Sequence, residues 1–218
     1  MTSASDRLIS GLVKNLEPVR PLPRLRMAFA TIIALWAILL GLVYWTHDGE
    51  MGARSLIANR VYLGSFLGLL VAALGATVSA LAAGVPGRER LEIGGMLAAL
   101  LGLFSAAIAC LIGMNALGLS AGASPAGADA MCFRKGALLS LLPAGVILSF
   151  LVRGWAAHPV RAALVALLGS GALGALIVHL SCDLLGPRHL LVSHLSVPIV
   201  LVLIGIYPLA VVLRRIRR

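Results

Sequence analysis

Two thiols and two imidazoles occur where long apolar runs of the sequence break. Cys132 stands in Met-Cys-Phe-Arg-Lys, Cys182 precedes Asp-Leu-Leu-Gly-Pro-Arg and His189, and His194 follows five residues later. Thiolate and imidazole together suit soft or borderline metal ions, whereas two thiols can instead be oxidised to a disulfide. These residue types therefore indicate a sensing site at Cys132 and Cys182, with His189 and His194 as further candidate ligands.

A second interpretation of the same residues needs no ligand. A cysteine at the end of a span is often an apolar filler, and the two histidines can equally lie at the membrane interface. The third cysteine, Cys110, lies within an unbroken apolar run and is predicted to be a core residue. The three cysteines contain no Cys-x-x-Cys pair, which argues against a zinc ribbon or a thioredoxin-type redox pair.

The composition places these residues in a membrane protein. Hydrophobic residues make up 60% of the chain and charged residues 12%, whereas charged residues make up about a quarter of soluble domains. The apolar runs lack the alternation of a β-barrel, and backbone groups in lipid must find hydrogen-bond partners within their own segment. The sequence therefore predicts an all-α, polytopic membrane protein.

Six apolar runs are long enough to form a six-helix transmembrane bundle. The expected spans cover residues 27–45, 61–84, 93–117, 137–152, 160–180 and 189–213. The expected organisation is a cytoplasmic segment 1–26, a transmembrane domain 27–213 and a basic tail 214–218. Residues 118–136 are expected to form a flexible, exposed connector that contains Cys132, and Pro143 is expected to kink the fourth span.

The segment before the first span is predicted to contact a partner or the membrane surface. Five of its apolar residues recur at the spacing of one helical stripe: Leu8, Ile9, Leu12, Val13 and Leu16. Pro18 ends this helix, and prolines and arginines then form an extended basic connector. Such a stripe suits a groove on a protein or the lipid interface. Charged residues interrupt any signal-peptide core, so the segment is expected to stay in the mature protein.

The distribution of Lys and Arg predicts the orientation. The amino-terminal segment, the second and fourth connectors and the tail hold thirteen of these residues: Arg7, Lys14, Arg20, Arg24, Arg26, Arg88, Arg90, Arg153, Arg161, Arg214, Arg215, Arg217 and Arg218. The other side holds five: Arg54, Arg60, Arg134, Lys135 and Arg188. Because Lys and Arg accumulate on the cytoplasmic side, both termini are predicted to be cytoplasmic, with Cys132 and Cys182 facing outward. The net charge of +10 then reflects topology, and no direct binding of nucleic acid is expected.

Three stretches of the sequence resemble one known family. They are residues 8–24, the run from Cys132 to Gly136, and Cys182 with the following residues 186–194. The chain resembles NrsF-type anti-sigma factors, six-span proteins of the bacterial inner membrane that restrain an extracytoplasmic-function sigma factor. The resemblance implies that residues 1–26 hold the sigma factor inactive, and that Cys132 and Cys182 take part in sensing metal or oxidant stress. The inner connectors and the tail are further candidates for sigma-factor binding.

Two other functions are compatible with a six-span chain. A transporter or channel for a small solute or a metal would need a polar path, yet the interiors of the expected spans contain no Asp, Glu, Lys or Arg. A membrane thiol oxidoreductase would usually need a Cys-x-x-Cys pair and a redox partner. The sequence contains no P-loop, HExxH or GxSxG motif. A regulator is therefore predicted, rather than an enzyme, with sigma factor and membrane lipids as partners and no obligatory cofactor.

Overall fold

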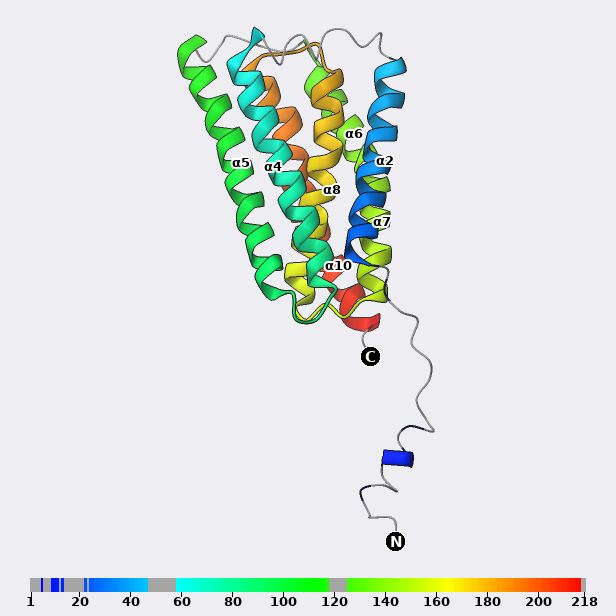
Figure 1. The fold of residues 1–218 in the computed structure, drawn as a ribbon. Helices are drawn as coiled ribbons and strands as arrows, with labels where there is room; N and C mark the ends of the chain where they lie inside the picture. The colour runs from blue at the N-terminus through cyan, green and yellow to red at the C-terminus, as the bar shows by residue number, and fades with distance from the viewer. Residues whose placement is uncertain are drawn as a thin grey trace.

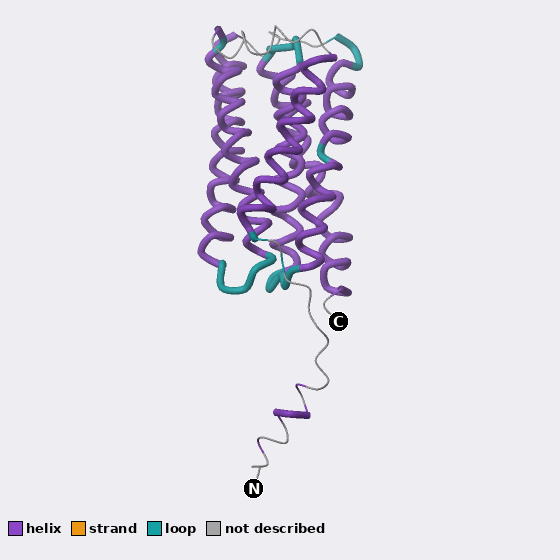
Figure 2. Tube along the Cα trace, turned by 45° about the vertical axis from the view of Figure 1, so that its right-hand side comes forward, coloured by secondary structure: helices purple, strands orange, loops and turns teal. Residues whose placement is uncertain are grey.

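The computed structural model describes residues 24–46, 58–117 and 125–216, together with residues 5, 9–11, 13 and 22. All regular structure within these residues is helical, and none of it is β-strand (Figure 2). The long helices stand side by side as one bundle (Figure 1). The prediction of an all-α fold is confirmed.

Six helical stretches are long and apolar enough to cross a membrane, as predicted. Four of them are single helices: α2 (Leu25–Thr46), α4 (Arg60–Ala83), α5 (Glu89–Leu117) and α8 (Pro159–Ser181). The fourth stretch consists of α6 (Ala128–Leu139) and α7 (Leu141–Arg153). The last consists of α9 (Pro187–His189), the π-helical segment η1 (Leu190–Leu195) and α10 (Ser196–Ile216). Helix α2 begins and α10 ends at the same end of the bundle (Figure 1).

Helix α8 forms the centre of the bundle. It contacts α4, α6, α7 and α10. In its apolar membrane-spanning stretch 83% of the residues are buried, compared with 11% in the corresponding stretch of α2 at the periphery. Small residues allow these close approaches, as expected for helices in lipid. A Cβ atom on Gly102 of α5 would lie 2.5 Å from the backbone nitrogen of Ala72 of α4, and one on Gly171 would lie 2.6 Å from Cα of Pro198.

The region around Cys132 differs from the expected exposed connector. Gly127 adopts a left-handed conformation with φ of 83°, and α6 begins at the next residue. Asp129 in the first turn stabilises this start, because a carboxylate interacts favourably with the amino-terminal end of a helix dipole. Cys132 is therefore a helical residue. The fourth spanning stretch consequently contains Asp129, Arg134 and Lys135, which corrects the prediction of charge-free spans.

The predicted kink in the fourth span lies at Ser140, between α6 and α7. Pro143 cannot donate a hydrogen bond to the carbonyl of Leu139, and its ring crowds that carbonyl, so the helix is interrupted at this point. Helix α8 approaches the kink through Gly174, where any Cβ would clash with the carbonyl of Gly136. This close approach brings the first half of the fourth span next to the end of α8.

Candidate functional site

The two candidate sensing cysteines meet at one end of the bundle. Cys132 lies in the second turn of α6, and Cys182 follows the last residue of α8 in an extended conformation. Their Sγ atoms are 3.6 Å apart, although fifty residues separate them in the sequence, and both are free thiols. Cys132 is half-buried and Cys182 is buried. The structure thus brings the two predicted residues together, with Cys182 buried.

His189 directly precedes the π-helical segment η1, and His194 lies within it. In an α-helix, residues five positions apart point about 140° away from each other. The wider π-turn, with its i to i+5 hydrogen bonding, places His189 and His194 on one side instead. Pro198 follows this segment, and its ring would crowd the carbonyl of His194 in a regular α-helix. Both imidazoles are fully buried within the bundle.

The four residues form one compact cluster. One ligand atom from each of Cys132, Cys182, His189 and His194 lies within 4.8 Å of the other three. Within the cluster, Sγ of Cys182 lies 3.3 Å from Nε2 of His189. Two thiols and two imidazoles are the ligand set of four-coordinate Zn²⁺ sites in proteins. The cluster can therefore hold a thiophilic metal ion, and its thiols can also be oxidised as a pair.

A carboxylate orients the first histidine. Oδ1 of Asp129 lies 2.5 Å from Nδ1 of His189 and accepts a hydrogen bond of 3.1 Å from the hydroxyl of Ser193. A carboxylate only accepts hydrogen bonds, so Nδ1 of His189 carries the proton and Nε2 presents its lone pair to the cluster. Such carboxylate–histidine pairs commonly orient metal ligands.

A third buried histidine, His179, orients His194. Nδ1 of His194 lies 3.0 Å from Nδ1 of His179, and Nε2 of His179 lies 3.3 Å from the backbone carbonyl of Tyr62. The carbonyl can only accept, so His179 donates from Nε2 and accepts at Nδ1 from the N–H of His194. Nε2 of His194 is then unprotonated. It is a buried atom with no hydrogen-bond partner within the described structure.

Tyr62 in turn holds His179. The two rings stack with their centroids 4.2 Å apart, and the Tyr62 hydroxyl donates a hydrogen bond to the carbonyl of His179. Both side chains are fully buried. A chain of polar contacts therefore leads from His194 on η1, through α8, to α4 in the bundle interior.

The environment of Cys182 favours the neutral thiol. Its hydrogen bond with Cys132 and, to a lesser extent, its burial raise the pKa of the Cys182 thiol above its ordinary value. Cys182 is therefore protonated at neutral pH before any ligand binds. Because metals bind the thiolate, ligation at this position has to release a proton.

Sequence reasoning missed three residues of this site. Asp129 falls in the connector that the sequence predicts to be exposed, and Tyr62 lies 117 residues before His179 with no motif to link them. For the third residue, His179, the one sequence feature that links it to the site is its position one helical turn before Cys182. The contacts of Asp129 and Tyr62 arise from helix packing, so the local sequence carried no sign of them.

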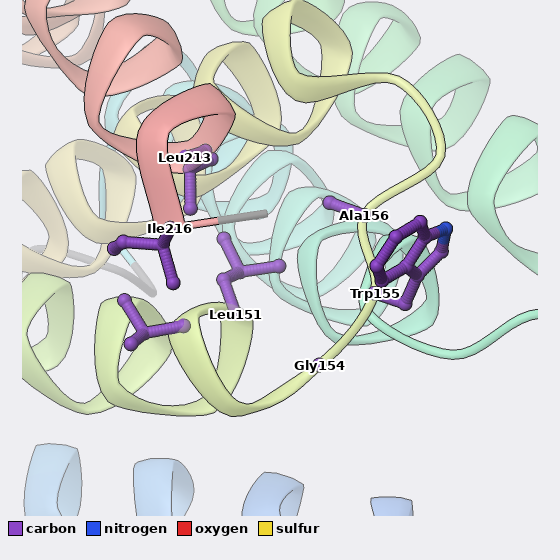
Figure 3. Close-up of a pocket in the computed structure, with 7 residues that line it drawn as sticks. Leu151, Gly154, Trp155, Ala156, Leu213 and Ile216 are labelled. Atoms are coloured by element: carbon purple, nitrogen blue, oxygen red, sulfur yellow. The ribbon is translucent and has the colours of Figure 1, made fainter. Parts of the chain in front are cut away.

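Among the hollows at the opposite end of the bundle, two lie close to where the described part of the chain begins and ends. One, of about 570 Å³, is lined by apolar and basic residues where α2 begins: Leu22, Arg24, Leu25, Arg26, Val85 and Arg88. The other, of about 80 Å³, lies between α7 and α10, where Figure 3 shows Leu151, Leu213 and Ile216 around it and Trp155 on the adjoining loop. This end of the molecule offers apolar and basic surface together.

The structure describes two of the five residues of the predicted partner-binding stripe. Ile9 and Val13 are helical positions with exposed side chains. The other three members, Leu8, Leu12 and Leu16, lie outside the residues that the structure describes. The role of the stripe therefore stays a prediction.

Comparison with known proteins identifies one family. The model of the family described as NrsF, negative regulator of sigma F, matches residues 12–215. The match extends over all six spanning helices and all four residues of the cysteine–histidine cluster. No curated protein and no protein of solved structure matches the chain.

Proposed function

Because the chain belongs to the NrsF family of negative regulators of sigma F, we propose that it is a membrane-bound anti-sigma factor that sequesters an extracytoplasmic-function sigma factor. The observation that carries this proposal is the family match over residues 12–215. In this proposal the protein lies in the bacterial inner membrane, has no catalytic activity, and releases the sigma factor under metal or oxidant stress outside the cytoplasm.

The distribution of basic residues supports an orientation with both termini in the cytoplasm. Among the described residues, the end at which α2 begins carries eight: Arg24, Arg26, Arg88, Arg90, Arg153, Arg161, Arg214 and Arg215. The end with the cysteine–histidine cluster carries four: Arg60, Arg134, Lys135 and Arg188. Since positive charge is retained on the cytoplasmic side, the cluster would face the periplasm.

This orientation predicts how single-cysteine chains react with a membrane-impermeant maleimide. A chain that keeps only Cys132, which is half-buried near the outer end, is expected to be labelled in intact, reduced cells. A chain that keeps only Cys110, which is fully buried, is expected to be labelled only after denaturation. Labelling of Cys132 only after the inner membrane is opened would contradict the orientation.

The sigma factor would bind at the inner end. Residues 1–26 supply the stripe of Leu8, Ile9, Leu12, Val13 and Leu16, and the 570 Å³ hollow lies where this segment joins the bundle. Its apolar lining with three arginines suits an acidic, amphipathic segment of a partner. Binding there would hold the sigma factor at the membrane, away from RNA polymerase.

The cysteine pair would control release. A soft metal ion could bridge the thiolates, or a peroxide could accept two electrons and two protons from the thiols, giving a disulfide and water. Either event ties α6 to the junction of α8 and α9. The bound or oxidised form must favour a packing with lower affinity for the sigma factor, since equal affinity for both packings would change nothing.

Affinity purification of the full-length chain from solubilised membranes tests this function. The purified chain is expected to bring down a sigma factor, identified by mass spectrometry, and to lose it when cells are first treated with Cd²⁺ or with peroxide. Deleting the chain should raise transcription from that sigma factor's promoters. Unchanged promoter activity in the deletion strain, or purification without any sigma factor, would contradict the proposal.

A further inference from the structure

We propose that Cys132, Cys182, His189 and His194 form a closed four-coordinate site for a thiophilic divalent ion of the Zn²⁺ type, and that His179 is the positioning residue that aims His194 at this ion. The inference deepens the proposed function, on which it rests for its biological role. It assigns the sensing cluster to metal binding, with a defined ligand set, rather than to thiol oxidation alone.

The first support is the ligand geometry. Four donor atoms within 4.8 Å of one another can converge on one ion after small side-chain movements. Three of the four residues are buried, and Cys132 is half-buried. Such enclosure suits a closed site with four protein ligands, rather than a catalytic site that keeps one position open to water. The two thiolates would select a soft or borderline ion over Mg²⁺ or Ca²⁺.

The second support is the orphaned nitrogen of His194. A buried nitrogen without a hydrogen-bond partner is costly, so its retention needs a reason. The contact with His179 already uses Nδ1 of His194, which leaves the Nε2 lone pair to face the cluster. On the other side, Asp129 occupies Nδ1 of His189 and leaves its Nε2 near Cys182. Both imidazoles are thus held in the tautomer that binds a metal through Nε2.

The third support is that the metal site would connect several membrane-spanning helices. Metal binding would join α6 through Cys132, the end of α8 through Cys182, and the π-segment through His194. His179 and Tyr62 extend the same chain of contacts to α4. Occupancy of the site would therefore restrain four membrane-spanning stretches against one another, which is a means of favouring one bundle packing over another.

Cobalt titration of the purified, reduced, full-length chain in detergent tests the site. Co²⁺ reports its own coordination through intense visible bands when tetrahedral, and through an ultraviolet charge-transfer band that grows with the number of thiolates. We expect one Co²⁺ per chain with both signatures, displaced by one equivalent of Zn²⁺. Cys132→Ser or Cys182→Ser should weaken the charge-transfer band, whereas Cys110→Ser should leave the spectrum unchanged.

Two substitutions at His179 form a matched pair. His179→Phe keeps an aromatic ring against Tyr62 but removes the acceptor for the N–H of His194, and metal affinity is expected to fall about 10- to 100-fold. His179→Asn can place its side-chain oxygen near the position of Nδ1 and should restore most of this affinity. A purely structural role would favour His179→Phe, which keeps a ring against Tyr62, so a higher affinity of His179→Asn indicates positioning rather than packing. Thermal unfolding of the metal-free proteins checks that each variant is folded.

Several outcomes would overturn the inference, and they differ from failure of the proposed function. Absence of a tetrahedral cobalt spectrum in the wild type, or unchanged binding by His194→Ala, would remove the four-ligand site. Equal affinities of folded His179→Phe and His179→Asn would remove the positioning role. A wild-type spectrum in a chain that never binds a sigma factor would instead leave the metal site intact and refute the regulatory function.

Discussion

Cys132→Ser and Cys182→Ser are each expected to abolish induction of the sigma-dependent promoters by metal or oxidant. The two Sγ atoms are 3.6 Å apart and contribute to the same site, so the loss of either removes the bridge between α6 and the end of α8. Because the pair acts as one unit, the double variant should resemble the single variants. The measurement is the dose response of a promoter reporter to Cd²⁺ and to peroxide, which should become flat.

The third cysteine supplies the matched control for this experiment. Cys110 is fully buried in α5 and is not one of the four residues of the cluster, so Cys110→Ser should respond with the wild-type dose dependence. Equal membrane abundance of all variants, measured by immunoblot, separates lost sensing from lost protein. A double variant that is still induced with the wild-type dose response would exclude the cysteines from the mechanism. Sensing would then have to be sought in other outer residues or in a periplasmic partner.

Aspartate substitutions in the amino-terminal stripe should have the opposite effect and produce constitutive transcription. Leu12→Asp with Leu16→Asp places two carboxylates on the apolar face that is proposed to contact the sigma factor. A buried, unpaired charge in an interface is strongly unfavourable, so the sigma factor should be released without any inducer. Reporter activity is expected to approach that of a strain without the anti-sigma factor.

A polar neighbour provides the control. Ser10 is an exposed helical position that lies away from the apolar stripe at about 100° per residue, so Ser10→Asp adds a carboxylate outside the proposed contact and should leave repression intact. Vesicle binding by a peptide of residues 1–26 measures the competing interaction with lipid separately. If repression and co-purification of the sigma factor survive Leu12→Asp with Leu16→Asp at normal protein abundance, this segment is not the binding surface.

The membrane-spanning architecture could be predicted from the sequence because hydropathy is a local property. Each span contains enough consecutive apolar residues to cross a bilayer, and backbone hydrogen bonding in lipid then requires helices. The position of Cys110 within a long apolar run likewise indicated a buried residue, and the structure confirms it. The kink near Pro143 also followed from one residue and its missing N–H.

The start of α6 shows where local hydropathy was misleading. Residues 128–136 are too polar to appear as part of a span, yet the left-handed turn at Gly127 and the acidic residue in the first turn start the helix there. This extension places Asp129 beside His189 and turns Cys132 toward Cys182. A flexible connector would have held neither side chain in a defined position.

The residue types of the candidate site came from the sequence, and its geometry came from the tertiary structure. Cys132, Cys182, His189 and His194 could be selected because thiols and imidazoles together suit soft or borderline metal ions and stand at breaks in the apolar runs. Their convergence depends on the π-turn of η1, which precedes Pro198, and on the close approach of α8 at Gly174, which arises from packing between distant segments. The roles of His179 and Tyr62 depend on the same packing, because a hydrogen bond between helices exists only once the bundle has brought its two partners together.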